Sequence, residues 1–161
     1  GGQPIMSYNF GAGNKGRVKK AFFTQFKVCT IFTSCFWLIM LLFPKLFAGI
    51  FSNNTDLITY TAWALRIYMA GIFSLGFQVS CQQSFMALGQ AKVSLLLACL
   101  RKLILLIPLI FILPLFIQDK VFAVFLAEPI SDIVAATITT ITFMSRFNGI
   151  LNKGSKMKTA E

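Results

Sequence analysis

The chain has 161 residues, of which 57% are hydrophobic and only 12% are charged, and its mean hydropathy is +0.75. A soluble domain of this length could not bury so much apolar surface, so the composition excludes an ordinary water-soluble fold. The long continuous apolar runs predict membrane helices, since barrel strands would show short alternating segments. The net charge of +10 would suggest nucleic acid on a soluble protein. Here the basic residues gather in alternate loops, as in membrane proteins, and no nucleic-acid partner is expected.

The first twenty residues combine a helix end with a basic loop. Gln3, Pro4 and Ile5 suit the last turns of an apolar helix, and the small residues and asparagines of segment 9–14 end it. Four basic residues then follow within segment 15–20. Taken alone, these residues fit a loop that anchors on anionic lipid. They fit equally a cytoplasmic gate whose small residues permit close approach.

Four apolar segments follow, and each reaches the roughly 20 residues that a membrane helix needs. We expect these helices at about residues 21–43, 57–88, 93–117 and 121–147. Segment 46–56 is predicted to be a short loop, with Asn54, Thr55 and Asp56 capping the second helix. Residues 152–161 are predicted to form a disordered cytoplasmic tail.

Glycine and proline mark two further features of these helices. Gly89 is expected to end the second helix in a left-handed turn. Pro108 and Pro114 lie within the third apolar segment, and a membrane helix accommodates proline by bending. We therefore expect a bent third helix.

The basic residues give the expected orientation. Segment 13–20, the turn at Lys92 and the C-terminal tail are rich in lysine and arginine, whereas the two opposite loops are near neutral. The positive side of a membrane protein faces the cytoplasm. A multi-pass protein of the plasma membrane with a cytoplasmic C-terminus is therefore expected, with the lipid bilayer as its first partner.

Charged groups inside the apolar segments are the strongest functional candidates, because they are costly in a membrane. Glu128 and Asp132 are four residues apart, so they share one helix face beside Pro129. They fit a coupling site for a cation or proton, or a counter-charge for a cationic substrate. Alternatively, they pair with basic residues to lock helices together, and the available partners are Arg66, Arg101 and Lys102.

Three polar side chains on one face of the second segment are candidates for a substrate cavity: Ser74, Gln78 and Gln82. Glutamine offers both a donor and an acceptor, which suits varied cationic and aromatic compounds. The alternative is ordinary hydrogen bonding between helices. The sequence contains no histidine and no cysteine pair with metal-ligand spacing, so no metal site, cofactor or enzyme activity is expected.

The N-terminal segment closely resembles the signature Q-P-x-x-x-Y-N-[FY]-G-A-x-x-x-x-R-V of the multidrug and toxic compound extrusion (MATE) transporters. The matching residues are Gln3, Pro4, Tyr8, Asn9, Gly11, Ala12, Arg17 and Val18. The resemblance continues in Q-S-F-M-A-L-G-Q-A-K at 83–92 and in E-P-I-S-D at 128–132. The MepA-like branch is the most similar one that we identify.

The resemblance implies a fold and a function. MATE transporters have twelve helices in two lobes, and they exchange organic cations and other drugs for sodium ions or protons. On this interpretation the chain is part of the C-terminal lobe, with four transmembrane helices and the end of a fifth. The missing N-terminal lobe of the same polypeptide would then be its partner, and small cationic or amphipathic drugs its substrates. Gln3 to Arg17 would form the cytoplasmic signature or gate.

Two other functions remain open at this point. The chain could be a non-transporting membrane fragment or an assembly subunit, because four helices alone should not transport. It could also belong to a lipid-linked oligosaccharide flippase of the same superfamily. A flippase is expected to have more basic residues in its cavity than the glutamine and serine side chains seen here.

Overall fold

The computed structural model describes the backbone of residues 1–158 and the side chains of residues 1–152. Within this part of the chain the fold is entirely helical, and four helical spans are long and apolar enough to cross a membrane. These spans are Lys15–Leu42, Thr55–Ala87, Ala91–Phe116 and Lys120–Asn152. The prediction of an all-α membrane protein with four spans is confirmed.

A short helix precedes the first span. Helix α1 (Gly2–Gly11) ends at the predicted break, and Gly13, with a φ of 72°, makes the left-handed turn into α2 (Lys15–Leu42). The first long helix thus begins before the expected position at 21 and includes the basic segment. This segment forms the first turns of α2 because long cationic side chains extend away from the helix while Val18 stays buried.

The connection after α2 differs from the predicted loop. Residues Pro44–Phe51 form helix α3, with Pro44 in the first turn, where its missing N–H leaves no helical bond unmade. Helix α4 (Thr55–Tyr68) then begins at the predicted cap. The Asn54 side-chain oxygen accepts hydrogen bonds from the backbone N–H groups of Asp56 at 3.0 Å and Leu57 at 3.4 Å.

The second span is a composite of three pieces: α4, the 3₁₀ segment η1 (Met69–Ser74) and α5 (Leu75–Ala87). The sequence did not predict this change of helix type. The span ends as predicted, because Gly89 has a φ of 73°. The third span is also composite: α6 (Ala91–Cys99), the π-helical segment η2 (Leu100–Leu106) and α7 (Ile107–Phe116), so the irregular stretch comes just before Pro108.

The fourth span is the long helix α8 (Lys120–Lys158), which contains Pro129. It continues well past the expected end at 147, so most of the predicted tail, residues 152–158, has a helical backbone. No proline follows Pro129, and Gly149 and Gly154 do not interrupt the helical backbone. Residues 159–161, the rest of the predicted tail, lie outside the described residues.

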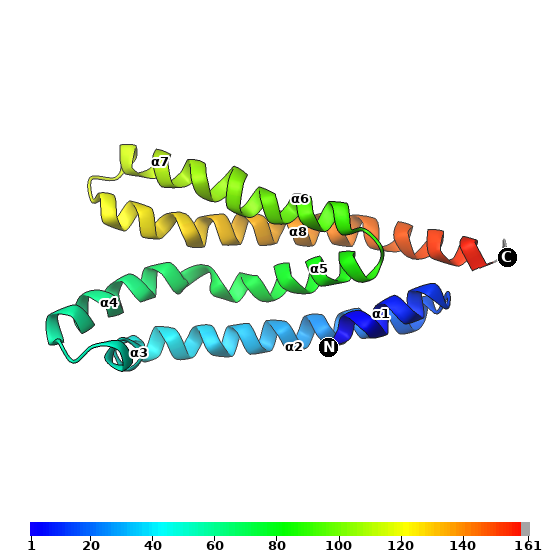
Figure 1. Cartoon of the computed structure of the whole chain (residues 1–161), viewed down its shortest axis with the longest axis horizontal. Helices are drawn as coiled ribbons and strands as arrows, with labels where there is room; N and C mark the ends of the chain where they lie inside the picture. Colours follow the sequence, from blue (N-terminus) through cyan, green and yellow to red (C-terminus); the bar gives the residue numbers. More distant parts are fainter. Residues whose placement is uncertain (159–161) are drawn as a thin grey trace.

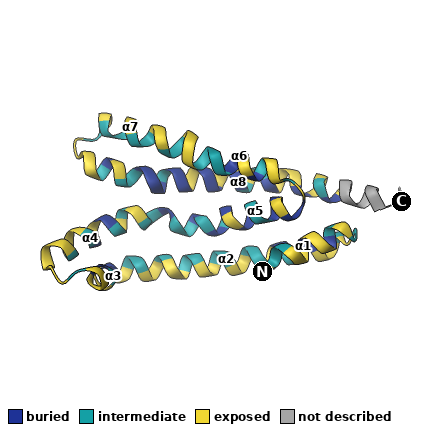
Figure 2. Ribbon diagram, in the orientation of Figure 1, coloured by how far each residue is buried: buried dark blue, intermediate teal, exposed yellow. Residues whose placement is uncertain are grey.

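The spans lie side by side, with the second span and α8 in the middle (Figure 1). Helix α2 packs against η1 and α5 on one side, while α7 and η2 pack against α8 on the other. The two central spans are the most buried: α5 and the middle of α8 have the most buried residues, whereas the outer helices α2 and α7 are largely exposed (Figure 2). The exposed faces carry large apolar side chains, such as Phe32, Phe111 and Leu115, which suit contact with lipid.

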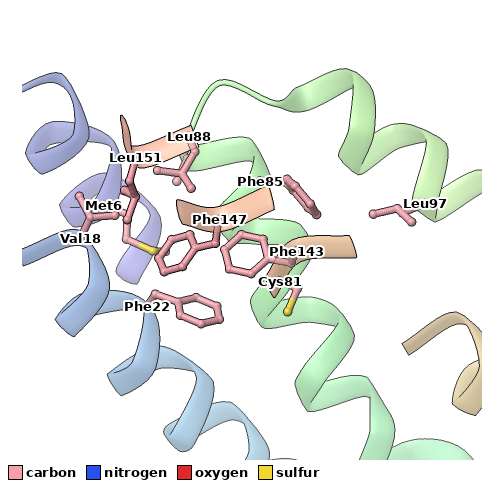
Figure 3. Packing of buried hydrophobic residues seen from close by; sticks show 11 residues of the cluster. Met6, Val18, Phe22, Cys81, Phe85, Leu88, Leu97, Phe143, Phe147 and Leu151 are labelled. Carbon is pink, nitrogen blue, oxygen red and sulfur yellow. The ribbon is translucent and has the colours of Figure 1, made fainter. Parts of the chain in front are cut away.

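A hydrophobic cluster closes one end of the bundle (Figure 3). Its centre is aromatic: the ring of Phe143 lies 4.6 Å from that of Phe22 and 4.9 Å from that of Phe85. Eleven buried residues form it: Met6, Val18, Phe22, Cys81, Phe85, Ala87, Leu88, Leu97, Phe143, Phe147 and Leu151. The cluster joins α1, α2, α5, α6 and α8, so it ties the short first helix to the spans.

Candidate functional site

The charged residues of the third span lie in its π-helical segment. Arg101 and Lys102 are consecutive, and a regular α-helix would point them in clearly different directions. The wider turn of the π-helix η2 brings the two side chains closer to one face, and π segments are often found at functional sites. Ser131 of α8 donates a hydrogen bond of 2.9 Å to the carbonyl oxygen of Arg101. This bond fixes the distorted segment against α8.

The two predicted carboxylates of α8 meet these cations. Arg101 Nε lies 2.6 Å from Asp132 Oδ1, and Lys102 Nζ lies 2.8 Å from Glu128 Oε1. A longer contact of 3.7 Å links the Arg101 guanidinium to Glu128 Oε1. Asp132 is only 2% exposed and Glu128 8%. We call these four residues, Arg101, Lys102, Glu128 and Asp132, the charge cluster.

The charge cluster lies deep within the spans. Arg101 comes ten residues after the start of α6, and Asp132 twelve residues after the start of α8. At 1.5 Å per residue these positions are about 15 and 18 Å from opposite ends of the helices, near the middle of a core about 30 Å thick. Two cations and two carboxylates sum to zero charge, which lowers the cost of placing ions there.

The alternative partner, Arg66, is not part of the charge cluster. It lies in the last turn of α4, its side chain is exposed, and it forms no ion pair with any described residue. Of the three basic residues that the sequence offered as partners, the structure therefore brings together Arg101 and Lys102 with the carboxylates.

Of the predicted cavity residues, Ser74 and Gln78 are buried between helices and Gln82 is half-buried. Ser74 donates to the carbonyl oxygen of Gly71 at 2.7 Å, and Gln82 exchanges two hydrogen bonds of 3.3 Å with Ser94 of α6. Gln78 is 1% exposed, and its Oε1 has no hydrogen-bond partner among the described residues. None of the three predicted residues lines the larger cavity found in this structure.

That cavity is a cleft of about 970 Å³ between α1, α2 and α5. Four signature residues line it: Gln3, Pro4, Asn9 and Arg17. Tyr8, Gly11 and Ala12 do not, and Tyr8 is 78% exposed. The polar lining also includes Thr24 and Gln25, which were not predicted from the sequence, and Gln83, which was named only as the first residue of the motif at 83–92. Their signal was present in the sequence, because amide side chains are uncommon in apolar segments.

Metal chemistry has no visible support in the described part of the chain. No group of three or more His, Cys, Asp or Glu side chains there is arranged to hold a metal ion. The carboxylates of the charge cluster are occupied by arginine and lysine, so their geometry is that of an ion-pair network.

Ionisable groups paired within the spans of a multi-pass bundle are typical of membrane transporters, in which such groups mark ion and substrate pathways. Residues 1–112 match the MatE family model, and the chain belongs to this family of transporters. No curated protein sequence matches the chain.

Solved structures agree with this assignment. The chain is similar to the MATE multidrug transporter DinF-BH, whose structure is in complex with rhodamine 6G, with 30% identity and a TM-score of 0.82. It also resembles inward-facing and outward-facing structures of a multidrug resistance MATE family transporter of the MOP superfamily, each with 17% identity and a TM-score of 0.84. Each match covers 92% of this chain, which spans about a third (33–34%) of the matched structures.

Proposed function

We propose that this chain is part of the C-terminal lobe of a multidrug efflux antiporter of the plasma membrane. The complete transporter would exchange small cationic or amphipathic drugs for sodium ions or protons. The MepA-like branch remains our proposed position within the family. The charge cluster is the observation on which this proposal depends, because two buried carboxylates near mid-membrane can exchange one cation for another.

The arrangement of the pairs supports an exchange role. Asp132 is held by the half-buried Arg101, while Lys102, whose side chain is 53% exposed, holds Glu128. A cationic drug or coupling ion that approached Glu128 could displace the mobile lysine more easily than the arginine, because a lysine head is a single point charge on a flexible stem. Glu128 is therefore the proposed exchange carboxylate, and Asp132 its fixed neighbour.

The cavity and the signature are the proposed substrate route. Ser74, Gln78 and Gln82 are kept as candidate contacts of the drug cavity, although they lie in the interface between helices. Gln3, Pro4, Asn9 and Arg17 line the cleft between α1, α2 and α5, and they are the proposed gate together with Tyr8, Gly11 and Ala12. The missing N-terminal lobe of the same polypeptide would complete both sites.

The proposed orientation places the C-terminus in the cytoplasm. Lys15 at the start of α2 donates a hydrogen bond of 2.9 Å to Asn152 near the end of α8. The hydrophobic cluster joins the same end to Leu88, next to the Gly89 turn. The basic segments thus share one end of the bundle, which supports a cytoplasmic position for that end.

The test is drug exchange by the full-length transporter in proteoliposomes, with rhodamine 6G as the probe and an imposed sodium or proton gradient. We expect Glu128→Gln to abolish gradient-driven movement of the dye while the variant remains folded. Asp119→Asn is the matched control. Asp119 is an exposed carboxylate that caps α8 at Val121 and Phe122, and asparagine can replace it as a cap.

Three outcomes separate the possibilities. Loss of exchange in the Glu128 variant but not in the Asp119 variant supports the antiporter. Normal exchange in both variants contradicts the role of Glu128. No exchange of rhodamine 6G in the wild type with either gradient contradicts the antiporter itself for this probe class, and favours the flippase or the non-transporting fragment.

A further inference from the structure

Two buried side-chain oxygens on neighbouring helices have no hydrogen-bond partner among the described residues. They are Gln78 Oε1 in α5 and Thr139 Oγ1 in α8. Gln78 is 1% exposed and Thr139 is fully buried. Buried polar groups in folded proteins are nearly always paired with protein atoms or ordered water, and each exception calls for an explanation.

Thr139 differs from two neighbouring threonines of its own helix. Thr137 and Thr140 each donate a hydrogen bond of 2.7 Å to the carbonyl oxygen four residues earlier, on Ile133 and Ala136. This is the ordinary way in which threonine satisfies its hydroxyl inside a helix. Thr139 makes no such bond, and its hydroxyl oxygen has no hydrogen-bond partner among the described residues.

The contacts between the second span and α8 place the two oxygens at one level. Both helices run in the same direction, as three successive contacts show: Gly71 with Asp132, Cys81 with Thr140, and Phe85 with Phe143. Gln78 lies between the first two of these positions on its helix, seven residues after Gly71. Thr139 lies between them on α8, seven residues after Asp132. They therefore occupy the same stretch of the interface.

Helix α6 borders this stretch from a third side. Arg101, which follows α6, contacts Asp132, and Ser94 of α6 bonds to Gln82, one turn beyond Gln78. Polar groups thus succeed one another from the charge cluster toward the Gly89 turn. Asp132 comes first, the unpaired oxygens of Gln78 and Thr139 follow, and the Gln82–Ser94 pair comes last.

We propose that Gln78 and Thr139 bind a buried water molecule at the interface of α5 and α8. A glutamine oxygen accepts hydrogen bonds, whereas a threonine hydroxyl both donates and accepts, so water suits both partners. The two oxygens are not bonded to each other, as a bridge through water requires. A buried water typically makes about three hydrogen bonds, and this site offers two polar partners from different helices.

The water site extends the charge cluster toward the Gly89 turn. A proton that reaches the charge cluster from that side needs polar groups or water along its way, since the adjoining Phe85, Leu97 and Phe143 are apolar and buried. The water held by Gln78 and Thr139 supplies one step of such a route, about two helical turns from Asp132. This role as a proton route rests on the proposed antiporter function, whereas the water site itself does not.

The site is tested by a double-mutant cycle on the thermal stability of the full-length protein in detergent. Thr139→Val keeps the shape and removes the hydroxyl. A hydroxyl that binds water stabilises the fold, so we expect this change to lower the melting temperature by a few degrees. If the hydroxyl were buried without water or another partner, its removal would raise the melting temperature, because the free-energy cost of burying an unpaired polar group would be lost. An unchanged or raised melting temperature would overturn the proposal.

The cycle also tests whether the two residues share one water. We expect Thr139→Val combined with Gln78→Leu to be less destabilising than the sum of the single changes, because one water is lost only once. Thr137→Val is the control, since the exposed Thr137 hydroxyl bonds to its own helix. The destabilisation caused by Thr137→Val should therefore add to that caused by Gln78→Leu. Additivity of Thr139→Val with Gln78→Leu would overturn the shared site.

A second measurement keeps the proposal testable if Gln78→Leu does not fold. Brief X-ray irradiation turns bound water into hydroxyl radicals that oxidise adjacent side chains. Cys81, one turn after Gln78 and fully buried, should be oxidised in the wild type and protected in Thr139→Val. A Cys81 that stays unoxidised in the wild type would overturn the water site.

The proton route has its own readout. In proton-driven exchange of rhodamine 6G we expect Thr139→Val to slow the initial rate several-fold while binding of the dye stays unchanged. If the wild type does not exchange the dye but the stability cycle is coupled, the antiporter function fails and the water site stands. If exchange proceeds and Thr139→Val matches the wild type, the proton route fails.

Discussion

Gly71 packs directly against the backbone of Pro129. A Cβ atom added to Gly71 would lie 2.7 Å from Pro129 Cα, 3.0 Å from the Pro129 carbonyl oxygen and 3.2 Å from Asp132 Cβ. The 3₁₀ segment of the second span thus meets the proline of α8 at the level of the charge cluster. The two backbones can come so close because Gly71 has no side chain. The 3₁₀ segment and the part of α8 around Pro129 therefore stabilise each other by direct packing.

We predict that Gly71→Ala destabilises the protein by about 1–3 kcal/mol, the usual cost of forcing a methyl group into a packed interior. The obstructing atoms belong to backbone and cannot rotate away. Thermal unfolding in detergent measures the change. Gly149→Ala in α8 is the control, because nothing lies within 4 Å of its added Cβ. Equal melting temperatures for Gly71→Ala and Gly149→Ala would contradict the close packing.

Removing one partner of the Arg101–Asp132 pair is predicted to lower the free energy of unfolding more than removing the charge of Lys102. Asp132→Asn leaves the guanidinium without its 2.6 Å partner, and breaking such a buried pair typically costs about 3–5 kcal/mol. Lys102→Gln should cost less, since its side chain is 53% exposed and Arg101 still contacts Glu128. Chemical unfolding of both variants gives the comparison. A larger loss for Lys102→Gln would show that Lys102 is the main anchor.

The double variant separates pairing from other effects. Arg101→Gln combined with Asp132→Asn removes both charges, so neither is left buried and unpaired. We expect it to be more stable than Asp132→Asn alone, because the unpaired charge is the largest part of the cost. A double variant that is less stable than both single variants would mean that each residue acts through separate contacts.

The sequence was sufficient to predict the four membrane spans and the pair of carboxylates on one helix face. Apolar runs of the required length located four membrane helices, and the spacing of Glu128 and Asp132 placed both on one helix face. The sequence did not decide which basic residues pair with these carboxylates, because Arg66, Arg101 and Lys102 all lie in apolar segments. Only the packing of η2 against α8 decides among them, and such packing depends on contacts between distant parts of the chain.

The changes of helix type could not be predicted from local sequence. Segment 69–74 has no proline, yet it is a 3₁₀ helix, because its shape is set by the close contact of Gly71 with Pro129. The π segment 100–106 likewise depends on ion pairs and a serine contributed by α8. Helix α3 was missed for another reason: Pro44 ends one helix and also begins the next, whereas segment 46–56 was predicted as a loop.

The cap of the second span offers a test with a neighbouring control. Asn54→Ala removes the side-chain oxygen that accepts from Asp56 and Leu57, and the loss of such a cap costs about 1 kcal/mol. Asn53→Ala should be near neutral, because Asn53 is exposed and its side chain makes no hydrogen bond with the described residues. Thermal unfolding distinguishes the two. Equal losses would mean that the cap does not stabilise the folded span.

The last prediction concerns the aromatic centre of the hydrophobic cluster. Phe143→Ala should be the most destabilising of the single aromatic truncations in the cluster, by about 3–5 kcal/mol, because its ring contacts all three other phenylalanine rings of the cluster, those of Phe22, Phe85 and Phe147. In a membrane this cost comes mainly from lost packing, since lipid is as apolar as the protein interior. Phe111→Ala removes a ring that is 72% exposed on α7, so it should cost much less. Unfolding of the two variants in the same detergent makes the comparison. A similar loss for both would mean that burial in lipid, and not the ring contacts of Phe143, determines the stability of this end of the bundle.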